Sequence, residues 1–392
     1  MSESGTRARR GVGRRMQVIA VTGTSGKTTT TWLAASVLAE AGLRAGVVSD
    51  LGCVDADGTF VGHFDRRSPD ALAARLAAFA RSGCTHAVVE MPHTLLEAGA
   101  VGRGTCGTVV VTSAVRGPRG ERSARRRIER RIVEALASDG CLVAPRDPRF
   151  APLFAAAARR RGVTGLAVGL DDSCDVWAQP VERGLHGQVF LAAAAGQVVP
   201  MAVDVPVASF ARNAMCAAAV GLRCGVPLDV AARGVEACGS VAGRVERLDR
   251  GQDFAAFLDA PGSGHALAST LVSLRRLTPG RLAVIADQRF VDGLGAIAFA
   301  RPVRQRCDDV VVVPAGVLDD EADEAALAAY ARIDLLLGRL GARDCLLVLG
   351  HTDPVPRPRQ SGGDVPLATL VDGWLRLAHP PRVAAAGPRR AA

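Results

Sequence analysis

A short segment near the start of the chain, residues 17–30, constrains the fold more than any other. Residues 17–21 (QVIAV) are an apolar, β-branched run that predicts a buried strand, and residues 28–41 have the apolar spacing of a helix. Between them stands Thr-Gly-Thr-Ser-Gly-Lys-Thr-Thr-Thr at 22–30. Gly23 and Gly26 would let backbone N–H groups turn inward around an anion, and the helix N-terminus would add partial positive charge. The segment therefore predicts a phosphate-binding loop.

Lys27 is the only lysine among the 48 basic residues of the chain, and all the others are arginines. Its retention indicates a position that arginine cannot fill. In a phosphate loop this lysine reaches the β- and γ-phosphates, and the hydroxyl of Thr28 can bind Mg²⁺. The pattern is a shorter variant of the usual loop, because valine stands at 21 where the standard motif begins with glycine; the alternative is a simple glycine turn. The residues predicted to bind nucleotide here are Gly23, Thr24, Ser25, Gly26, Lys27, Thr28 and Thr29.

Strand-like and helix-like segments alternate along most of the chain, which favours α/β architecture with parallel sheets covered on both faces. The predicted strands are 45–49, 86–90, 109–112, 141–145, an antiparallel pair at 188–193 and 197–203, 254–259, 281–286, 309–313 and 345–350. The predicted helices are 70–81, 213–225, 228–238, 264–277, 293–306, 321–340 and 367–377. The polar stretch 239–253 predicts a domain boundary.

This pattern predicts a central domain with the phosphate loop and a parallel sheet at 16–243, and a smaller Rossmann-like α/β domain at 244–379. A basic N-terminus at 1–15 and a tail of Pro, Ala and Arg at 380–392 are expected to be disordered. No apolar run approaches the ~20 residues needed to span a bilayer, and no secretory signal core is present, so we expect a cytoplasmic protein without membrane partners. The ten cysteines include no C-x-x-C pair, which indicates neither a zinc nor a redox motif.

The loop at Thr22–Thr30 resembles that of the Mur ligase superfamily, the ATP-dependent amide-forming ligases of peptidoglycan synthesis, and within it the UDP-N-acetylmuramoyl-tripeptide synthetases. Further segments resemble the family's motifs in the same order. They are Ser68–Leu72 (T-T-P-x-x-L), Ala87–Met91 (the strand ending in a Mg²⁺-binding Glu), Phe210–Ala214 (N-x-x-N-A), Gly243–Arg247 (G-R-x-E-x) and Leu258–Asp259 (the start of D-Y-A-H-x-P).

The resemblance implies a ligase that uses ATP and Mg²⁺ to join a carboxylate acceptor to an amino acid or amine, through an acyl phosphate and with release of ADP. It implies that Lys27 and Glu90 are catalytic, and that Thr28 and Glu90 bind the metal. It also implies nucleotide contacts for Asn213 near the adenine, Asp259 near the ribose, and Arg244, with Ser68 and Pro69 at the acceptor.

Four departures from the family pattern leave alternatives open. Where the family reads T-N-x-x-x-D-H-L-D, residues 112–120 lack the metal-binding His, for which His93 is a candidate substitute. The family's carbamylated Lys is missing from 128–133, and arginine cannot carry a carbamate. The family's UDP-recognising domain is not expected in the 21 residues before Thr22, and the D-N-P-R signature is replaced at 313–319. The alternatives are a degenerate relative that binds ATP as a regulatory or scaffold protein without ligation, and a different P-loop ATPase or kinase.

Eight arginines gather at 116–131. Such a cluster can attract a polyanion, but no aromatic residue is interleaved, so nucleic acid binding is not expected. Two interpretations of the cluster remain: it forms a solvated helix and loop, or its arginines bind nucleotide phosphate or the acceptor carboxylate. With the family's second set of metal ligands missing, we expect a single Mg²⁺ per nucleotide and no requirement for bicarbonate.

Overall fold

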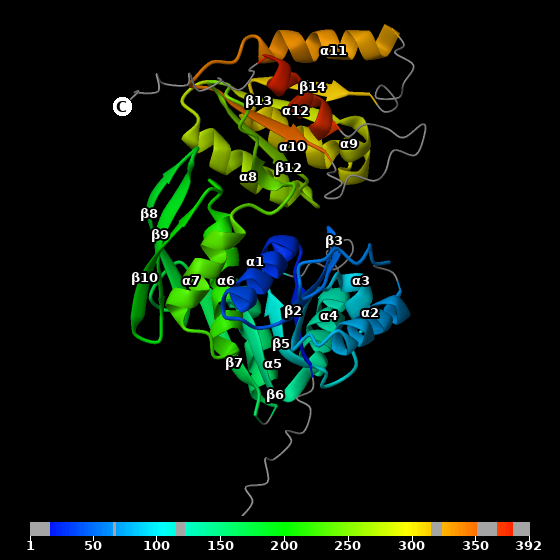
Figure 1. Ribbon diagram of the computed structural model, residues 1–392, viewed down its shortest axis with the longest axis vertical. Helices are drawn as coiled ribbons and strands as arrows, with labels where there is room; N and C mark the ends of the chain where they lie inside the picture. The colour runs from blue at the N-terminus through cyan, green and yellow to red at the C-terminus, as the bar shows by residue number, and fades with distance from the viewer. Residues whose placement is uncertain are drawn as a thin grey trace, which may run out of the picture.

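The computed structural model describes residues 16–65, 68–114, 122–160, 162–314, 324–350 and 367–378, which form two sheets with helices on both faces of the larger one (Figure 1). The larger sheet has ten strands in the order β10-β9-β8-β7-β6-β5-β1-β4-β2-β3, and the smaller has five in the order β11-β12-β15-β13-β14. The predicted disorder at 1–15 and 380–392 lies outside the described residues, as do residues 116–121 of the arginine cluster.

β1 lies at the centre of the larger sheet, parallel to β4 and β5, and Val21 is in register with both Glu90 and Val110. The carboxyl ends of these strands therefore meet at one edge, where ligands bind in open α/β sheets. The strands are β1 Gln17–Thr22, β2 Ala45–Ser49, β3 Gly52–Val54, β4 His86–Glu90, β5 Cys106–Val111, β6 Leu136–Pro145, β7 Thr164–Gly169, β8 Val176–Gly184, β9 Gly187–Ala194 and β10 Gln197–Val203.

Helices cover both faces of this sheet, as the strand–helix alternation predicts. On one face α1 packs against α6 and α7, so closely that a Cβ on Gly234 would lie 2.6 Å from the Cα of Val37. On the other face the core includes Phe79, Ile128 and Leu153. The helices are α1 Lys27–Glu40, α2 Pro69–Arg81, α3 His93–Glu97, α4 Arg122–Ala135, η2 Pro148–Phe150, α5 Ala151–Ala158, α6 Ser209–Arg223 and α7 Leu228–Cys238.

The second sheet is parallel except for β11, which pairs antiparallel with β12. Its strands are β11 Arg244–Arg247, β12 Ala255–Asp259, β13 Leu282–Asp287, β14 Asp309–Val313 and β15 Cys345–Leu349. Its helices are α8 Gly264–Leu277, α9 Gln288–Leu294, α10 Ala296–Arg306, α11 Glu324–Leu337 and α12 Leu367–Ala378. The predicted α/β class is confirmed in both sheets.

Several predicted boundaries are wrong, each for a local reason. The single helix expected at 293–306 is two helices, because Gly295 adopts φ +92° between them. The helix expected from residue 213 begins at Ser209. The polar stretch 239–253 contains β11, whose short polar sequence gives no strand pattern. Strands β3, β7 and β8 and helices α3 and α5 were not predicted.

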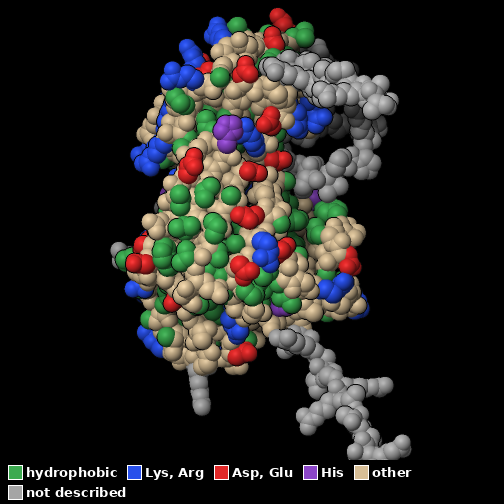
Figure 2. All heavy atoms as spheres, turned by 60° about the vertical axis from the view of Figure 1, so that its left-hand side comes forward, with side chains coloured by type: hydrophobic (Ala, Val, Ile, Leu, Met, Phe, Trp, Pro, Cys, Tyr) green, Lys and Arg blue, Asp and Glu red, His purple; other side chains and the backbone are tan. Residues whose placement is uncertain are grey.

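The outer face of the antiparallel strands β8–β10 exposes apolar side chains, among them Val181 at 61% and Val198 at 59% exposure. Figure 2 turns this side toward the viewer and shows hydrophobic side chains gathered there. Among the described residues no helix is both long and apolar enough to cross a membrane. Of the ten free cysteines, seven are buried, as expected of small apolar side chains.

Candidate functional site

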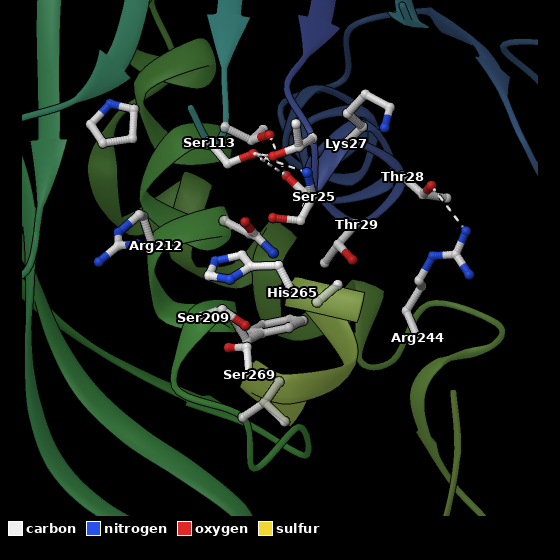
Figure 3. Close-up of a pocket in the computed structure, with 18 of the residues that line it drawn as sticks. Ser25, Lys27, Thr28, Thr29, Ser113, Ser209, Arg212, Arg244, His265 and Ser269 are labelled. Carbon is white, nitrogen blue, oxygen red and sulfur yellow. Dashed lines mark hydrogen bonds between the residues drawn. The ribbon is translucent and has the colours of Figure 1, made fainter. Parts of the chain in front are cut away.

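A cavity of about 390 Å³ lies where the carboxyl ends of β1, β4 and β5 face the second sheet (Figure 3). Its walls are the loop before α1, the start of α6, the strand β11 and the helix α8. All but one of the residues predicted to bind nucleotide or metal line it: Thr24, Ser25, Gly26, Lys27, Thr28, Thr29, Glu90, Asn213, Arg244 and Asp259. The exception is Gly23, near the start of the loop.

The loop turns into α1 through Gly26 in the left-handed conformation, with φ +83°. No side chain caps this helix end, so its first N–H groups stay available to an anion. Gly26 also lies against Asn213, since an added Cβ would stand 2.6 Å from Asn213 Oδ1. Glycine is required here for both its backbone angle and its lack of a side chain.

We expect Gly26→Ala to weaken ADP binding at least about tenfold, because the loop must shift away from Asn213 and loses its left-handed turn. Isothermal titration with ADP and Mg²⁺ measures this. Gly42→Ala is the matched control: Gly42 also has positive φ, +72°, but no heavy atom lies within 4 Å of its added Cβ. Equal losses in the two variants would contradict a specific role for the close contact.

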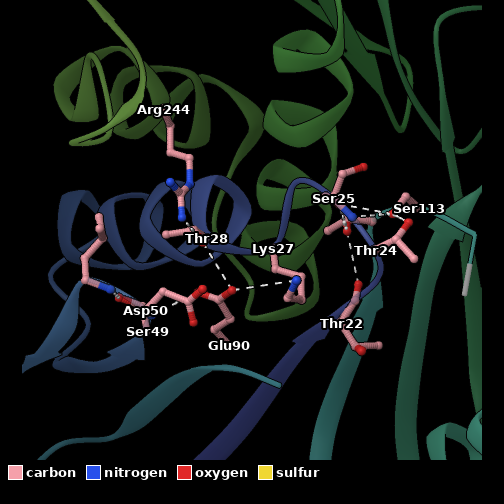
Figure 4. Close-up of polar contacts among 12 residues, drawn as sticks. Thr22, Thr24, Ser25, Lys27, Thr28, Ser49, Asp50, Glu90, Ser113 and Arg244 are labelled. Carbon is pink, nitrogen blue, oxygen red and sulfur yellow. Dashed lines mark hydrogen bonds and ion pairs between the residues drawn. The ribbon is translucent and has the colours of Figure 1, made fainter. Parts of the chain in front are cut away.

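The end of β5 holds the loop in place (Figure 4). Thr112 Oγ1 donates to the carbonyls of Ser25, at 2.6 Å, and Thr22, at 3.1 Å. Ser113 Oγ accepts from the Ser25 amide at 2.9 Å and lies 3.0 Å from Thr24 Oγ1. Gly23 lies against the same residue, because a Cβ added to Gly23 would stand 2.5 Å from Thr112 Oγ1. The loop is therefore preorganised by hydrogen bonds from a neighbouring strand.

Glu90 lies at the end of the cavity formed by the loop before α1, and it is only 3% exposed. Thr28 Oγ1 donates to its Oε1 at 3.1 Å, the amide of Asp50 donates to its Oε2 at 3.1 Å, and Lys27 Nζ is 3.9 Å from Oε1. Burial raises the pKa of Glu90, and the negative charge of Asp50 adds to this, while Lys27 and Arg244 oppose it. The side chain thus presents a buried carboxylate between two cations.

Arg244 reaches this cluster from β11 of the second sheet. Its Nη2 donates to Thr28 Oγ1 at 3.2 Å, and its Nη1 donates to the carbonyls of Gly243 and Ala260, both at 3.0 Å. The guanidinium therefore links the loop to the second sheet and adds a fixed cation beside Thr28.

The donor set fits a single hard cation. Thr28 Oγ1 and Glu90 Oε1 are oxygen atoms 3.1 Å apart, and Mg²⁺ typically takes one or two protein oxygens together with phosphate and water. No group of three or more His, Cys, Asp or Glu side chains suited to a metal lies within the described ranges. His93 does not line the cavity; both of its ring nitrogens are buried without a hydrogen-bond partner, and burial lowers its pKa to about 4.

Asp259 is a buried residue at the end of β12. Thr270 Oγ1 donates to its Oδ2 at 3.0 Å and the Val245 amide to its Oδ1 at 3.3 Å. Burial raises the pKa of Asp259 to about 6, against the opposing charge of Arg244. Asn213 stands on α6 beside the loop, so these two residues border the cavity from opposite sheets.

The structure does not bring the predicted acceptor residues to this cavity. Ser68 Oγ accepts from the Ala71 amide at 3.1 Å as the N-cap of α2, and Pro69 opens that helix. A binding role toward nucleotide phosphate or the acceptor carboxylate was suggested for the arginine cluster, but Arg125, Arg126, Arg127, Arg130 and Arg131 do not line this cavity. They lie on α4, on the sheet face opposite α1.

Sequence reasoning missed several residues that line the cavity: Asp50, Thr112, Ser113, Arg146, Arg212 and His265. Four of them lie one or two residues after the end of a parallel strand: Asp50, Thr112, Ser113 and Arg146. A polar residue directly after a predicted parallel strand is therefore the sequence signal that could have identified them. Arg212 is adjacent to the predicted Asn213. His265 comes from α8, whose approach to the first sheet no local pattern gives.

Comparison with known proteins places these features in context. Residues 21–221 match the family described as the Mur ligase middle domain. A UDP-N-acetylmuramoyl-L-alanyl-D-glutamate–2,6-diaminopimelate ligase of Corynebacterium glutamicum is 31% identical over 278 residues, which cover 68% of this chain and 52% of that protein. The corresponding ligase of Bacillus licheniformis is 25% identical over 281 residues, 69% of this chain and 57% of that protein. The chain thus spans about half the length of these curated relatives.

Solved structures share the fold. The Mycobacterium tuberculosis folylpolyglutamate synthase complexed with ADP aligns with a TM-score of 0.64 and 18% identity, covering 86% of this chain and 88% of that one. A UDP-N-acetylmuramoyl-L-alanyl-D-glutamate–2,6-diaminopimelate ligase aligns with a TM-score of 0.62 and 18% identity, covering 85% of this chain and 72% of that one. The alignments extend over both sheets.

Proposed function

The chain belongs to the family of the Mur ligase middle domain, and from that premise we propose that it is an ATP-dependent carboxylate–amine ligase that forms an amide through an acyl phosphate and releases ADP. The observation that supports this most is the convergence of Lys27, Thr28, Glu90 and Arg244 on one cavity. We further propose the domain limits 16–243 and 244–379, which agree with the division of strands between the two sheets.

In this proposal the triphosphate lies on the loop, with its oxygens toward the free N–H groups of α1. Lys27 holds the transferring phosphoryl group as a point cation, and Arg244 adds charge from the second sheet. A Mg²⁺ held by Thr28 and Glu90 would neutralise charge on the phosphate oxygens. Asn213 and Asp259 would position the adenine and the ribose. Phosphoryl transfer needs little covalent chemistry from the protein, so positioned charge is the main contribution of these residues.

We propose that one metal suffices. Thr28 and Glu90 supply a pair of oxygen atoms for it, and Arg244 already stands beside this pair as a fixed cation. Any carboxylate acceptor would then be screened by Lys27 and Arg244, since arginine pairs with carboxylates in bidentate geometry. Candidate acceptors come from the names of the relatives: UDP-N-acetylmuramoyl-L-alanyl-D-glutamate with diaminopimelate as the amine, and folylpolyglutamates with glutamate.

Steady-state ADP release tests this proposal. We expect release that requires both a candidate acid and a candidate amine, one Mg²⁺ bound per nucleotide, and equal rates with and without added bicarbonate, because the chain has no lysine except Lys27 to carry a carbamate. A rate that depends on bicarbonate would contradict the single-metal site. ADP binding without any acid- and amine-dependent turnover across the panel would favour a non-ligating nucleotide-binding protein.

The pKa of Asp259 gives a pH signature for nucleotide binding. Above about pH 6 its carboxylate is charged and can accept hydrogen bonds from ribose hydroxyls; below that it is protonated and accepts them poorly. We expect the wild type to bind ADP about tenfold more tightly than Asp259→Asn at pH 7.5, with the difference vanishing toward pH 5. Titration calorimetry at both pH values measures it, with Asp309→Asn, at the start of β14, as control. A difference that is constant with pH would rule out this role.

A further inference from the structure

The arginines of α4 have no part in the cavity described above, yet they line a second one. It has a volume of about 490 Å³ and lies between α4 and α5, both in the lower half of the molecule in Figure 1. Its lining consists of Arg103, Arg126, Glu129, Arg130, Val133, Glu134, Pro152, Leu153, Ala156 and Arg160. We refer to it as the α4–α5 groove. It shares no lining residue with the nucleotide cavity.

The two acids of the groove are already paired. Arg125 Nε donates to Glu129 Oε1 at 2.7 Å, and Arg103 Nη2 donates to Glu134 Oε1 at 2.8 Å. The hydrogen bond from Arg103, with the charges of Arg130 and Arg131, lowers the pKa of Glu134 below its usual range. Each of the two acids therefore has an arginine partner, and one of these partners, Arg125, lies outside the groove.

The remaining arginines of the groove are poorly compensated. Among the described residues Arg126 has no ion-pair partner, and Arg130 approaches only the shared Glu134, at 3.8 Å. Arg160 donates to the Val133 carbonyl, which carries no net charge. With four arginines and two glutamates the lining has a formal surplus of two positive charges.

This surplus of positive charge also destabilises helix α4. Arg126 and Arg130 are four residues apart on α4, so their side chains are neighbours on one helix face, where like charges are destabilising. Where a protein carries a locally unfavourable arrangement such as this like-charge pair, the place is often a functional site. An anion bound between the two guanidinium groups would relieve the repulsion.

The floor of the groove is apolar. Val133 and Leu153 are buried, and Pro152 and Ala156 stand beside them on α5. A volume of this size is in the range of small-molecule sites, which combine an apolar lining with a few placed polar groups. Planar guanidinium groups suit phosphate oxygens, to which they donate in pairs.

We propose that the α4–α5 groove is a second ligand site, which takes a small organic phosphomonoester: a dianionic phosphate held by Arg126, Arg130 and Arg160, with an apolar body against Val133, Pro152 and Leu153. Its charge matches the surplus of the lining, and the site is independent of the nucleotide cavity.

The test uses 2-naphthyl phosphate as the probe and the full-length chain saturated with ADP and Mg²⁺. We expect saturable one-to-one binding by fluorescence anisotropy, and a rise in melting temperature as the anion stabilises α4. Arg126→Ala/Arg130→Ala should bind at least about tenfold more weakly, since two charge-assisted contacts are lost. Alanine suits an exposed helix position, so this variant should fold.

The control variant is Arg301→Ala/Arg304→Ala, which removes two exposed arginines from another helix, α10, and should bind within about twofold of the wild type. The neutral 2-naphthol should not bind. Equal loss in both variants, or equal binding of 2-naphthol, would overturn the proposal. An absence of 2-naphthyl phosphate binding would also overturn the proposal. If poly-glutamate bound instead, α4 would be a docking surface for an acidic protein and not a site for a phosphomonoester.

Discussion

Lys27→Ala is expected to lower ATP turnover by about a thousandfold or more while the chain stays folded. The side chain stands at the N-terminus of α1, 3.9 Å from Glu90 and beside the backbone N–H groups that face the cavity. Its loss removes the only point cation that belongs to the loop. It also removes a charge that restrains the pKa of Glu90, so the carboxylate that we propose as a metal ligand becomes harder to ionise. Turnover is measured by ADP release, and folding by circular dichroism and melting temperature.

Two further variants sharpen this test. Lys27→Arg keeps the charge but brings a planar, wider group into a loop closed by Ser113 and Thr112, and we expect it to remain largely inactive. Arg44→Ala removes an exposed cation paired with Asp57 at 2.8 Å and should leave turnover unchanged. Full turnover in Lys27→Ala would show that the loop does not hold the phosphates.

Glu90→Gln should raise the Mg²⁺ concentration needed for half-maximal turnover by about 100-fold, because a neutral amide is a poor ligand for a hard cation. The substitution keeps the size of the side chain, and one amide oxygen can still accept a hydrogen bond from Thr28 or Asp50. The expected loss is therefore in metal affinity rather than in folding. A metal titration of ADP release measures it.

The matched control is Glu97→Gln on α3, seven residues along the chain. Its carboxylate is 3.8 Å from Arg127 and does not line the cavity. We expect its Mg²⁺ titration to coincide with that of the wild type. If Glu90→Gln and Glu97→Gln gave the same curve, Glu90 would not be a metal ligand.

The parts of the site that could be predicted from the sequence are those with a local signal. The strand, glycines and helix at 17–41 lie together in the sequence, so their backbone geometry follows from neighbouring residues. Glu90, Asn213, Arg244 and Asp259 were predicted through the family resemblance, and they line one cavity. Functional residues that directly follow a strand are marked by neighbouring residues, so they are the part of a site that a sequence predicts best.

The parts that could not be predicted depend on packing between distant segments. The hydrogen bond from the Ser25 amide to Ser113 Oγ joins residues 88 apart, and that from Arg244 to Thr28 joins residues 216 apart. Neither residue's own neighbourhood indicates its partner. The positive charge of the arginine cluster can be read from the sequence, but the side of the helix that each arginine occupies in the folded chain cannot. Only the packing of α4 against α3 and α5 decides which arginines reach a cavity.

Transfer of isotope from the acceptor to phosphate tests the proposed ligation most directly. Each candidate acid would be labelled with ¹⁸O in its free carboxylate and incubated with ATP, Mg²⁺, the amine and the full-length chain. An acyl phosphate intermediate leaves one carboxylate oxygen on the released phosphate. We expect phosphate that carries one ¹⁸O, together with equal amounts of amide and ADP, and none of these products from Lys27→Ala. Amide and ADP formed with unlabelled phosphate would contradict it.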